Sequence, residues 1–489
     1  MASYDWIKIE KPEDYEQLLG LLDGEFEPKR IVKKLKTKIT SRVKAVLVEH
    51  DYIDKDYRST LYNFYAKKGR PYRADCVRLH FFDEKVDFEV RPSDERGKRR
   101  TLDHHYYGYI VLRPTIRATL GRSVLSPDIR VGAHGSAIQG RHLVHLLGHR
   151  LSVWGFPSMD QHVDIAACAH VACWAVLRHY SQSYSQYREY LIYEIAKLAT
   201  GFEPGGISPS RGLDVWEAER VFNAAGCFPI IVGRDQLSTD EEFFGQMLAY
   251  LESGFPLFIG MDVDGDGHAI VAAGHNWKKG GVAATNHVWE QVDTLLTVDD
   301  NLLPYVTVPV DHGASDGAEP DYSTENFESF IVALPEKVGY PAEAIAEYAG
   351  VVESRLLIRA MGCEPESVSL HRYFMTTISG LRRYARESAS QLGKTLVDLI
   401  MRLDTAQFVW VLEFSSAEQW AGGRVAARGI VDASASHKDP DPIWLLHNEE
   451  VAFVFDRSKA ELAVQAVGLN RPGDVPLQRM EANLRPVRK

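Results

Sequence analysis

Two residues of this sequence, Cys168 and His268, stand in settings that suit nucleophilic chemistry. Cys168 follows Asp164 in an apolar run, HVDIAACAHVACWAVLRHYS, which predicts a helix capped by Asp164. In the first turn of a helix, unpaired backbone N–H groups point toward the sulfur and favour the thiolate. His268 begins another apolar run, HAIVAAG, which predicts a strand that presents an imidazole at its end. The pair predicts a thiol nucleophile with His268 as its base.

Three further polar residues stand where such a pair needs support. Gln161 precedes Cys168 by seven residues, so its side-chain amide could loop back and donate a hydrogen bond to an oxyanion beside the sulfur. Asp299 and Asp300 follow the predicted strand TLLTV. If that strand is an antiparallel neighbour of the His268 strand, either carboxylate could orient the imidazole. The sequence leaves open which of the two does so.

The other candidates for chemistry favour plainer interpretations. Cys173 lies five residues after Cys168, about 500° around a helix, and is expected to pack as a small hydrophobe. His275 and His287 are alternative bases, but neither starts a buried strand.

Two motifs resemble metal sites. The segment DVDGDG resembles the start of a calcium loop, but Ala273 occupies the position where the loop needs a Glu, and a strand follows instead of a helix. An acidic turn is therefore predicted there. The three histidines of RHLVHLLGHR lie in predicted strands, which would send His142 and His145 to opposite faces. No metal and no cofactor is expected.

The composition narrows the class of protein. The chain has 489 residues, enough for two to four domains, with 45% hydrophobic and 25% charged residues, which is typical of a globular protein. A net charge of −11 argues against a nucleic-acid partner. The sequence shows no signal peptide and no apolar run long enough to span a membrane, and its five cysteines form no disulfide pattern. A cytoplasmic protein with reduced thiols and no membrane partner is therefore expected.

Three regions of α+β character are predicted. Residues 1–150 form an N-terminal α+β module of unknown role. Residues 151–338 contain the candidate site, with helices and buried strands in alternation. Residues 339–489 are expected to be helical over 342–362 and 371–403 and then to form strands.

The middle region resembles papain-like cysteine peptidases, and more closely the bacteriocin-processing (double-glycine leader) peptidases. The resemblance rests on a Gln leading into a Cys-bearing helix, on ISPSRGLDVWEAERVFNAAG, on YLESGFPLFIGMDVDGDGHAIVAAGHN, and on an Asp after a further strand. It implies a papain-like fold in which a Cys-bearing helix packs on an antiparallel sheet. It further implies Gln161 as oxyanion donor, Cys168 as nucleophile, His268 as base, and Asp299 or Asp300 as orienting group.

This sequence departs from the family pattern at three places. Ala169 stands where the family has a Gly directly after the Cys, and the gap between Gln161 and Cys168 is one residue longer than usual. The interval of 31 residues between His268 and Asp299 is also longer than expected. The segment KKGGVAATNHVWEQ, which lengthens that interval, is expected to form a hairpin or flap.

The leading functional expectation is a cysteine-dependent hydrolase that cleaves an amide or isopeptide bond in a protein or peptide. Acyl transfer or deamidation by the same triad is an alternative, because the pocket chooses the acceptor. A catalytically silent scaffold that recognises a protein partner is another. The sequence does not indicate an oligomeric state.

Overall fold

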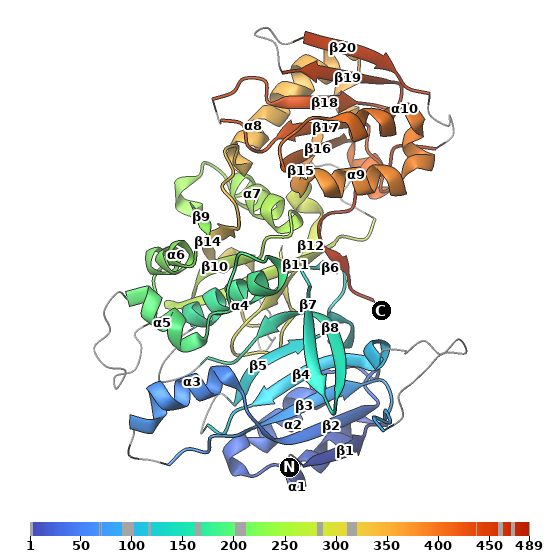
Figure 1. Cartoon of the computed structure of the whole chain (residues 1–489). Helices are drawn as coiled ribbons and strands as arrows, with labels where there is room; N and C mark the ends of the chain where they lie inside the picture. Colours follow the sequence, from blue (N-terminus) through green and yellow to red (C-terminus); the bar gives the residue numbers. More distant parts are fainter. Residues whose placement is uncertain are drawn as a thin grey trace.

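The computed structural model describes residues 3–67, 69, 71–89, 102–115, 119–161, 168–200, 212–280, 287–310, 320–436, 438–457, 463–470 and 475–488. Helices and three antiparallel sheets make this an α+β protein. Figure 1 shows the sheets stacked along the long axis of the molecule, the first at the bottom and the third at the top. Among the described residues, no helix combines the length and apolar character needed to cross a bilayer.

The first sheet has seven strands in the order β1-β2-β3-β4-β5-β8-β7. Their bounds are β1 Tyr4–Lys8, β2 Ala45–Tyr52, β3 Cys76–Phe82, β4 Tyr106–Leu112, β5 Leu120–Leu125, β7 Gly140–Leu146 and β8 His149–Ser158. Alternate residues of β2 serve opposite faces: Val46 and Val48 join one hydrophobic cluster, and Ala45 and Leu47 join another. The helices α1 Leu18–Leu21, α2 Pro28–Lys38 and α3 Lys55–Asn63 belong to this region.

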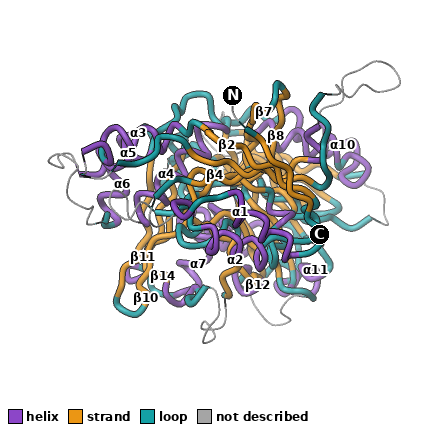
Figure 2. Tube along the Cα trace, turned by 90° about the horizontal axis from the view of Figure 1, so that it is seen from below, coloured by secondary structure: helices purple, strands orange, loops and turns teal. Residues whose placement is uncertain are grey.

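The second sheet has the order β13-β12-β11-β10-β14-β9. The short strand β6 pairs with β11, and β21 pairs with β6. The bounds are β6 Ser136–Ala137, β9 Phe228–Gly233, β10 Leu257–Val263, β11 Asp266–Trp277, β12 Val292–Val298, β13 Val306–Pro309, β14 Phe327–Leu334 and β21 Arg485–Pro486. Four helices accompany it: α4 Cys168–Ser183, α5 Ile192–Thr200, α6 Val215–Ala224 and α7 Asp240–Glu252. In Figures 1 and 2, α3, α5 and α6 lie together along one side of the molecule.

Local sequence explains where these helices begin and end. Asp214 caps α6 in a capping box with Glu217, and the side chain of Thr239 caps α7. Gly226 and Gly254 follow these two helices with φ of 91° and 84°, a backbone conformation that glycine adopts without steric cost. The helix α4 is apolar on nearly all sides and is buried accordingly.

The third sheet runs β15-β16-β17-β18-β19-β20. Its strands are β15 Leu370–Thr377, β16 Phe408–Ser415, β17 Ala427–Asp432, β18 Ile443–His447, β19 Val451–Asp456 and β20 Ala463–Gly468. The helices here are α8 Ala342–Val351, which continues as a π-helix over Val352–Ile358, and α9 Ile378–Glu387, α10 Ala389–Arg402 and α11 Ala417–Ala421.

The expectation of a helix from residue 371 onward is wrong, because residues 371–377 lie in β15. This strand pairs with β16 over its whole length and has alternating burial in its first half. Arg372 occupies a buried position in this strand, where it forms ion pairs with Glu252 and Glu413. Helices and strands therefore alternate in the C-terminal region instead of following one another in two blocks.

The second and third sheets share one hydrophobic core. The cluster that contains the α4 residue Trp174 also contains Trp410 of β16, whose indole N–H donates to Tyr340 O at 2.8 Å. The C-terminal strand β21 returns to the second sheet and pairs with β6, as Figure 1 shows. Apart from β21, the strands of these two sheets lie on opposite sides of the expected division at 338/339, but their packing crosses it. The expected division at 150/151 falls inside β8.

Candidate active site

The Cys-bearing helix α4 packs between two sheets. It contacts β10 and β11 of the second sheet and β7 and β8 of the first. Cys168 is its first described residue and is partly exposed, whereas Cys173, one turn and a half further along, is fully buried. Burial raises the pKa of the Cys173 thiol, so this cysteine is held as a neutral core residue. The expected cap, Asp164, lies outside the described residues.

His268 lies near the start of β11, directly after a tight turn. Asp264 and Gly265 form that turn with φ of 54° and 89°, and Gly265 N donates to Asp262 Oδ1 at 2.8 Å. This geometry is typical of a two-residue hairpin and matches the acidic turn that the sequence predicted for DVDGDG. Because the turn joins β10 to β11 directly, it holds His268 in a fixed register opposite Met261.

The structure brings Cys168, His268 and Asp299 together. His268 Nε2 lies 3.1 Å from Asp299 Oδ2, and His268 also forms a hydrogen bond with Cys168. Burial lowers the pKa of His268, but the hydrogen bonds to Asp299 and Cys168 outweigh it and raise that pKa to about 10. The imidazolium form is thereby favoured at neutral pH.

Asp299 is fixed by donors on both of its oxygens. It follows β12, which pairs with β11 in the antiparallel arrangement that the sequence suggested. Oδ2 accepts from Tyr322 Oη at 2.6 Å as well as facing His268, and Oδ1 accepts from Asn301 N at 2.7 Å. Burial alone would raise the pKa of Asp299, but the hydrogen bonds from His268, Tyr322 and Asn301 lower it below its ordinary value.

Asp300 occupies a different environment from Asp299. It is 3% exposed, its Oδ1 accepts from Asn301 Nδ2 at 3.1 Å, and its Oδ2 has no hydrogen-bond partner among the described residues. Burial, together with repulsion from Asp299, raises the pKa of Asp300 to about 8. Of the two carboxylates that the sequence offered, Asp299 is the one hydrogen-bonded to the imidazole.

Gln161 lies beside this group. Its side-chain amide donates to Asn301 Oδ1 at 3.5 Å, a long hydrogen bond that places it next to the Asp299–Asp300 pair. Residues 162–167, which join Gln161 to Cys168, lie outside the described residues. Part of the insert KKGGVAATNHVWEQ, residues 281–286, lies outside them too, and Val288–Gln291 at its end form a short 3-10 helix.

Sequence reasoning missed Tyr322 and Asn301. Tyr322 precedes a short 3-10 helix, Thr324–Asn326, and no pattern marks it as a partner of a residue 23 positions earlier. Asn301 directly follows the two predicted carboxylates in the sequence. Only the structure shows that its backbone N–H donates to Asp299 and its side-chain amide to Asp300.

The other candidates do not join this group. His275 Nε2 lies 3.2 Å from Glu252 Oε1, so its ring is engaged in a buried ion-pair cluster. His142 is buried and His145 exposed on β7, as strand geometry predicted.

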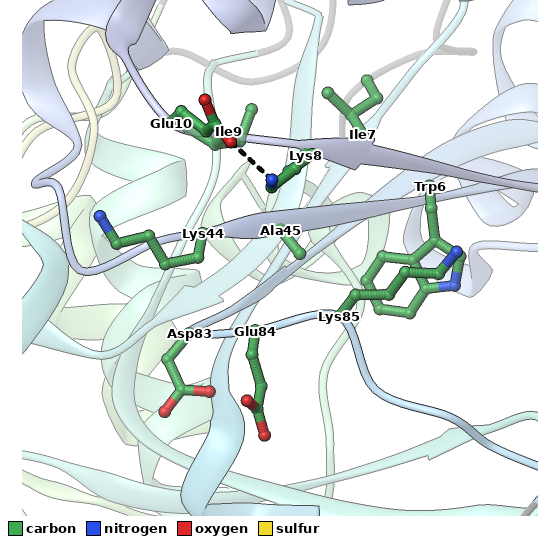
Figure 3. A pocket seen from close by; sticks show the side chains of 10 residues that line it. All are labelled: Trp6, Ile7, Lys8, Ile9, Glu10, Lys44, Ala45, Asp83, Glu84 and Lys85. Carbon is green, nitrogen blue, oxygen red and sulfur yellow. Dashed lines mark ion pairs between the residues drawn. The ribbon is translucent and has the colours of Figure 1, made fainter.

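A separate cavity of about 660 Å³ lies at the edge of the first sheet (Figure 3). The side chains that line it come from β1, the start of β2 and the loop after β3, and Lys8 forms an ion pair with Glu10. The lining residues are Trp6, Ile7, Lys8, Ile9, Glu10, Lys44, Ala45, Asp83, Glu84 and Lys85. They include neither a thiol nor an imidazole.

The chain was compared with known proteins, and no family model, curated protein or solved structure matches it.

Proposed function

We propose that this chain is a cysteine-dependent hydrolase with a papain-like middle region, in which Cys168 attacks an amide or isopeptide bond of a protein or peptide. One observation carries the proposal: a single imidazole, His268, is hydrogen-bonded to a thiol on one side and to a buried carboxylate on the other. That is the arrangement of nucleophile, base and orienting group that thiol catalysis requires. The packing of α4 on β10 and β11 supports the papain-like architecture.

The steps follow from the geometry. His268 holds the proton of Cys168 as an imidazolium, and the thiolate attacks the carbonyl carbon, so that a C–S bond forms while the carbonyl oxygen gains negative charge. The start of α4 and the amide of Gln161 are the donors proposed to meet this oxyanion. The imidazolium then donates its proton to the leaving amine as the C–N bond breaks. Water, deprotonated by His268, releases the acid from the acyl-thioenzyme.

Acyl transfer and deamidation would use the same acyl-thioenzyme and differ only in the acceptor or in the amide attacked. A silent scaffold would form no acyl-thioenzyme at all. The formation of this intermediate therefore separates both catalytic alternatives from the scaffold.

The test is a burst experiment with p-nitrophenyl acetate, a generic acyl donor. One equivalent of p-nitrophenol should be released rapidly, and mass spectrometry should find one acetyl group on Cys168. Cys168→Ala and Cys168→Ser should abolish the burst. Cys363→Ala, which removes the other partly exposed thiol, should retain it. A burst that survives Cys168→Ala, or an acetyl group found on another residue, would refute the proposal.

A further inference from the structure

We propose that the Nε2 side of His268, together with Asp299 and Asp300, binds a divalent transition-metal ion such as Zn²⁺, and that the bound ion switches off the thiol. The binding site stands on its own geometry. Its inhibitory effect rests on the function proposed above.

The ligand atoms are already gathered. One atom each from His268, Asp299 and Asp300 lies within 4.8 Å of the other two. An imidazole and two carboxylates form a donor set that suits Zn²⁺, and ligand–metal distances of about 2.0–2.2 Å require only a modest contraction of this group. Both carboxylates are almost fully buried, so little side-chain freedom remains to be lost on binding.

The second observation is a buried carboxylate oxygen without a hydrogen-bond donor. Asp300 Oδ2 accepts no hydrogen bond from the described residues, whereas Asp300 Oδ1 accepts one from Asn301 Nδ2. The charged groups that act on Asp300 are two further carboxylates, Asp299 and Asp160, and one imidazole, His268. A buried carboxylate among carboxylates is costly unless a cation or a proton balances it. A divalent ion at this point would supply the missing partner of Asp300 Oδ2.

Binding would silence the base through a simple exchange of protons. A metal ion needs the lone pair of His268 Nε2, so the proton on Nε2 must leave to solvent as the metal–nitrogen bond forms. A ring bound to the metal through Nε2 can hold only one proton, so it cannot become an imidazolium. The imidazolium that would accompany a Cys168 thiolate therefore cannot form, and Cys168 loses its base while the thiol itself remains outside the metal site.

Calorimetric titration of the full chain with ZnCl₂ tests the site without any activity measurement. Cys168→Ala should bind one Zn²⁺, because the thiol is not a ligand. Asp300→Asn in that background should weaken binding by at least about 100-fold, since losing a direct ligand costs more than the roughly 10- to 100-fold that outer partners contribute. Asp264→Asn, at the exposed turn of the same hairpin, is the matched control and should bind normally.

A spectroscopic readout does not depend on how well a variant folds. Co²⁺ added to the wild-type chain should give visible ligand-field bands without a sulfur-to-metal charge-transfer band in the near ultraviolet. Such a charge-transfer band would make Cys168 a ligand and overturn the donor set. So would the absence of zinc binding by Cys168→Ala, or an Asp300→Asn affinity equal to that of Asp264→Asn.

The regulatory half has its own outcome. Zn²⁺ at saturating concentration should suppress acetylation of Cys168 in the wild-type chain, and a chelator should restore it. Zinc that binds by calorimetry but leaves acetylation unchanged would overturn the inhibition alone. Failure of acetylation without zinc would instead contradict the proposed hydrolase function, so the two failures are distinguishable.

Discussion

The hydroxyl of Tyr322 lies 2.6 Å from Oδ2 of Asp299, the same carboxylate oxygen that faces His268 Nε2 at 3.1 Å. Tyr322 is 4% exposed, so this hydrogen bond is shielded from water. It fixes the direction of the carboxylate, and the carboxylate in turn fixes the imidazole. We therefore expect Tyr322 to act as a positioning residue, linked to Cys168 through Asp299 and His268.

Tyr322→Phe should slow acetylation of Cys168 by about tenfold. A hydrogen bond to a charged group contributes roughly 1.5–3 kcal/mol to stability. Only the part of this energy that holds His268 in its reactive orientation lowers the activation barrier, and about tenfold in rate corresponds to that part. Tyr15→Phe is the matched control, because Tyr15 is also buried but its hydroxyl has no hydrogen-bond partner among the described residues. Equal rates in the two variants would show that Tyr322 does not position the triad.

The buried ion pairs between the second and third sheets should be essential for stability. Arg372 on β15 donates to Glu252 at the end of α7 at 2.6 Å and to Glu413 on β16 at 2.6 Å. Arg372→Met would leave two carboxylates buried without this partner, which we expect to cost roughly 3–5 kcal/mol in the free energy of unfolding. Urea denaturation would measure the loss, with the exposed Arg383→Met on α9 as control. A loss no larger than that of the control would contradict this account.

Acid should destabilise the fold through the buried histidines of α4. Burial lowers the pKa of His170 and of His179 to about 4, below their ordinary value of 6.5. The unfolded chain therefore binds more protons below about pH 6.5, so the stability that these residues confer is complete above that pH and is lost as the pH falls toward 4. Between pH 7 and pH 5 each contributes a loss of about 2 kcal/mol.

His179→Gln should abolish its share of this pH dependence. The free energy of unfolding would be measured in urea at pH 7 and at pH 5. Its decrease from pH 7 to pH 5 should be about 2 kcal/mol smaller in the variant than in the wild-type chain. His145→Gln, on the exposed face of β7, should leave the dependence unchanged. An unaltered dependence in His179→Gln would mean that His179 is not held neutral by the fold.

The order of elements around the site was predictable because it depends on local patterns. The apolar run after Asp164 indicated a helix that carries Cys168, and the apolar runs of β11 and β12 indicated neighbouring strands that carry His268 and the carboxylates. The choice between Asp299 and Asp300 was not predictable, since it depends on which side chain the backbone turns toward the imidazole after β12.

Contacts between distant segments escaped prediction for a related reason. Tyr322 reaches Asp299 only through the packing of the segment before β14 against β12, which no local pattern encodes. The strand β15, for which a helix was expected, carries Arg372 in the interior, where two glutamates from other elements neutralise it. Buried charges break the apolar periodicity on which sequence interpretation depends.

The central claim is that His268 activates Cys168, and alkylation by iodoacetamide at neutral pH tests it most directly. Mass spectrometry would follow Cys168 and the partly exposed Cys363 in the same sample, so that each chain carries its own reference thiol. The account predicts that Cys168 reacts much faster than Cys363 in the wild-type chain and that His268→Asn brings the two rates together. Equal rates in the wild-type chain, or a Cys168 rate unaffected by His268→Asn, would contradict it.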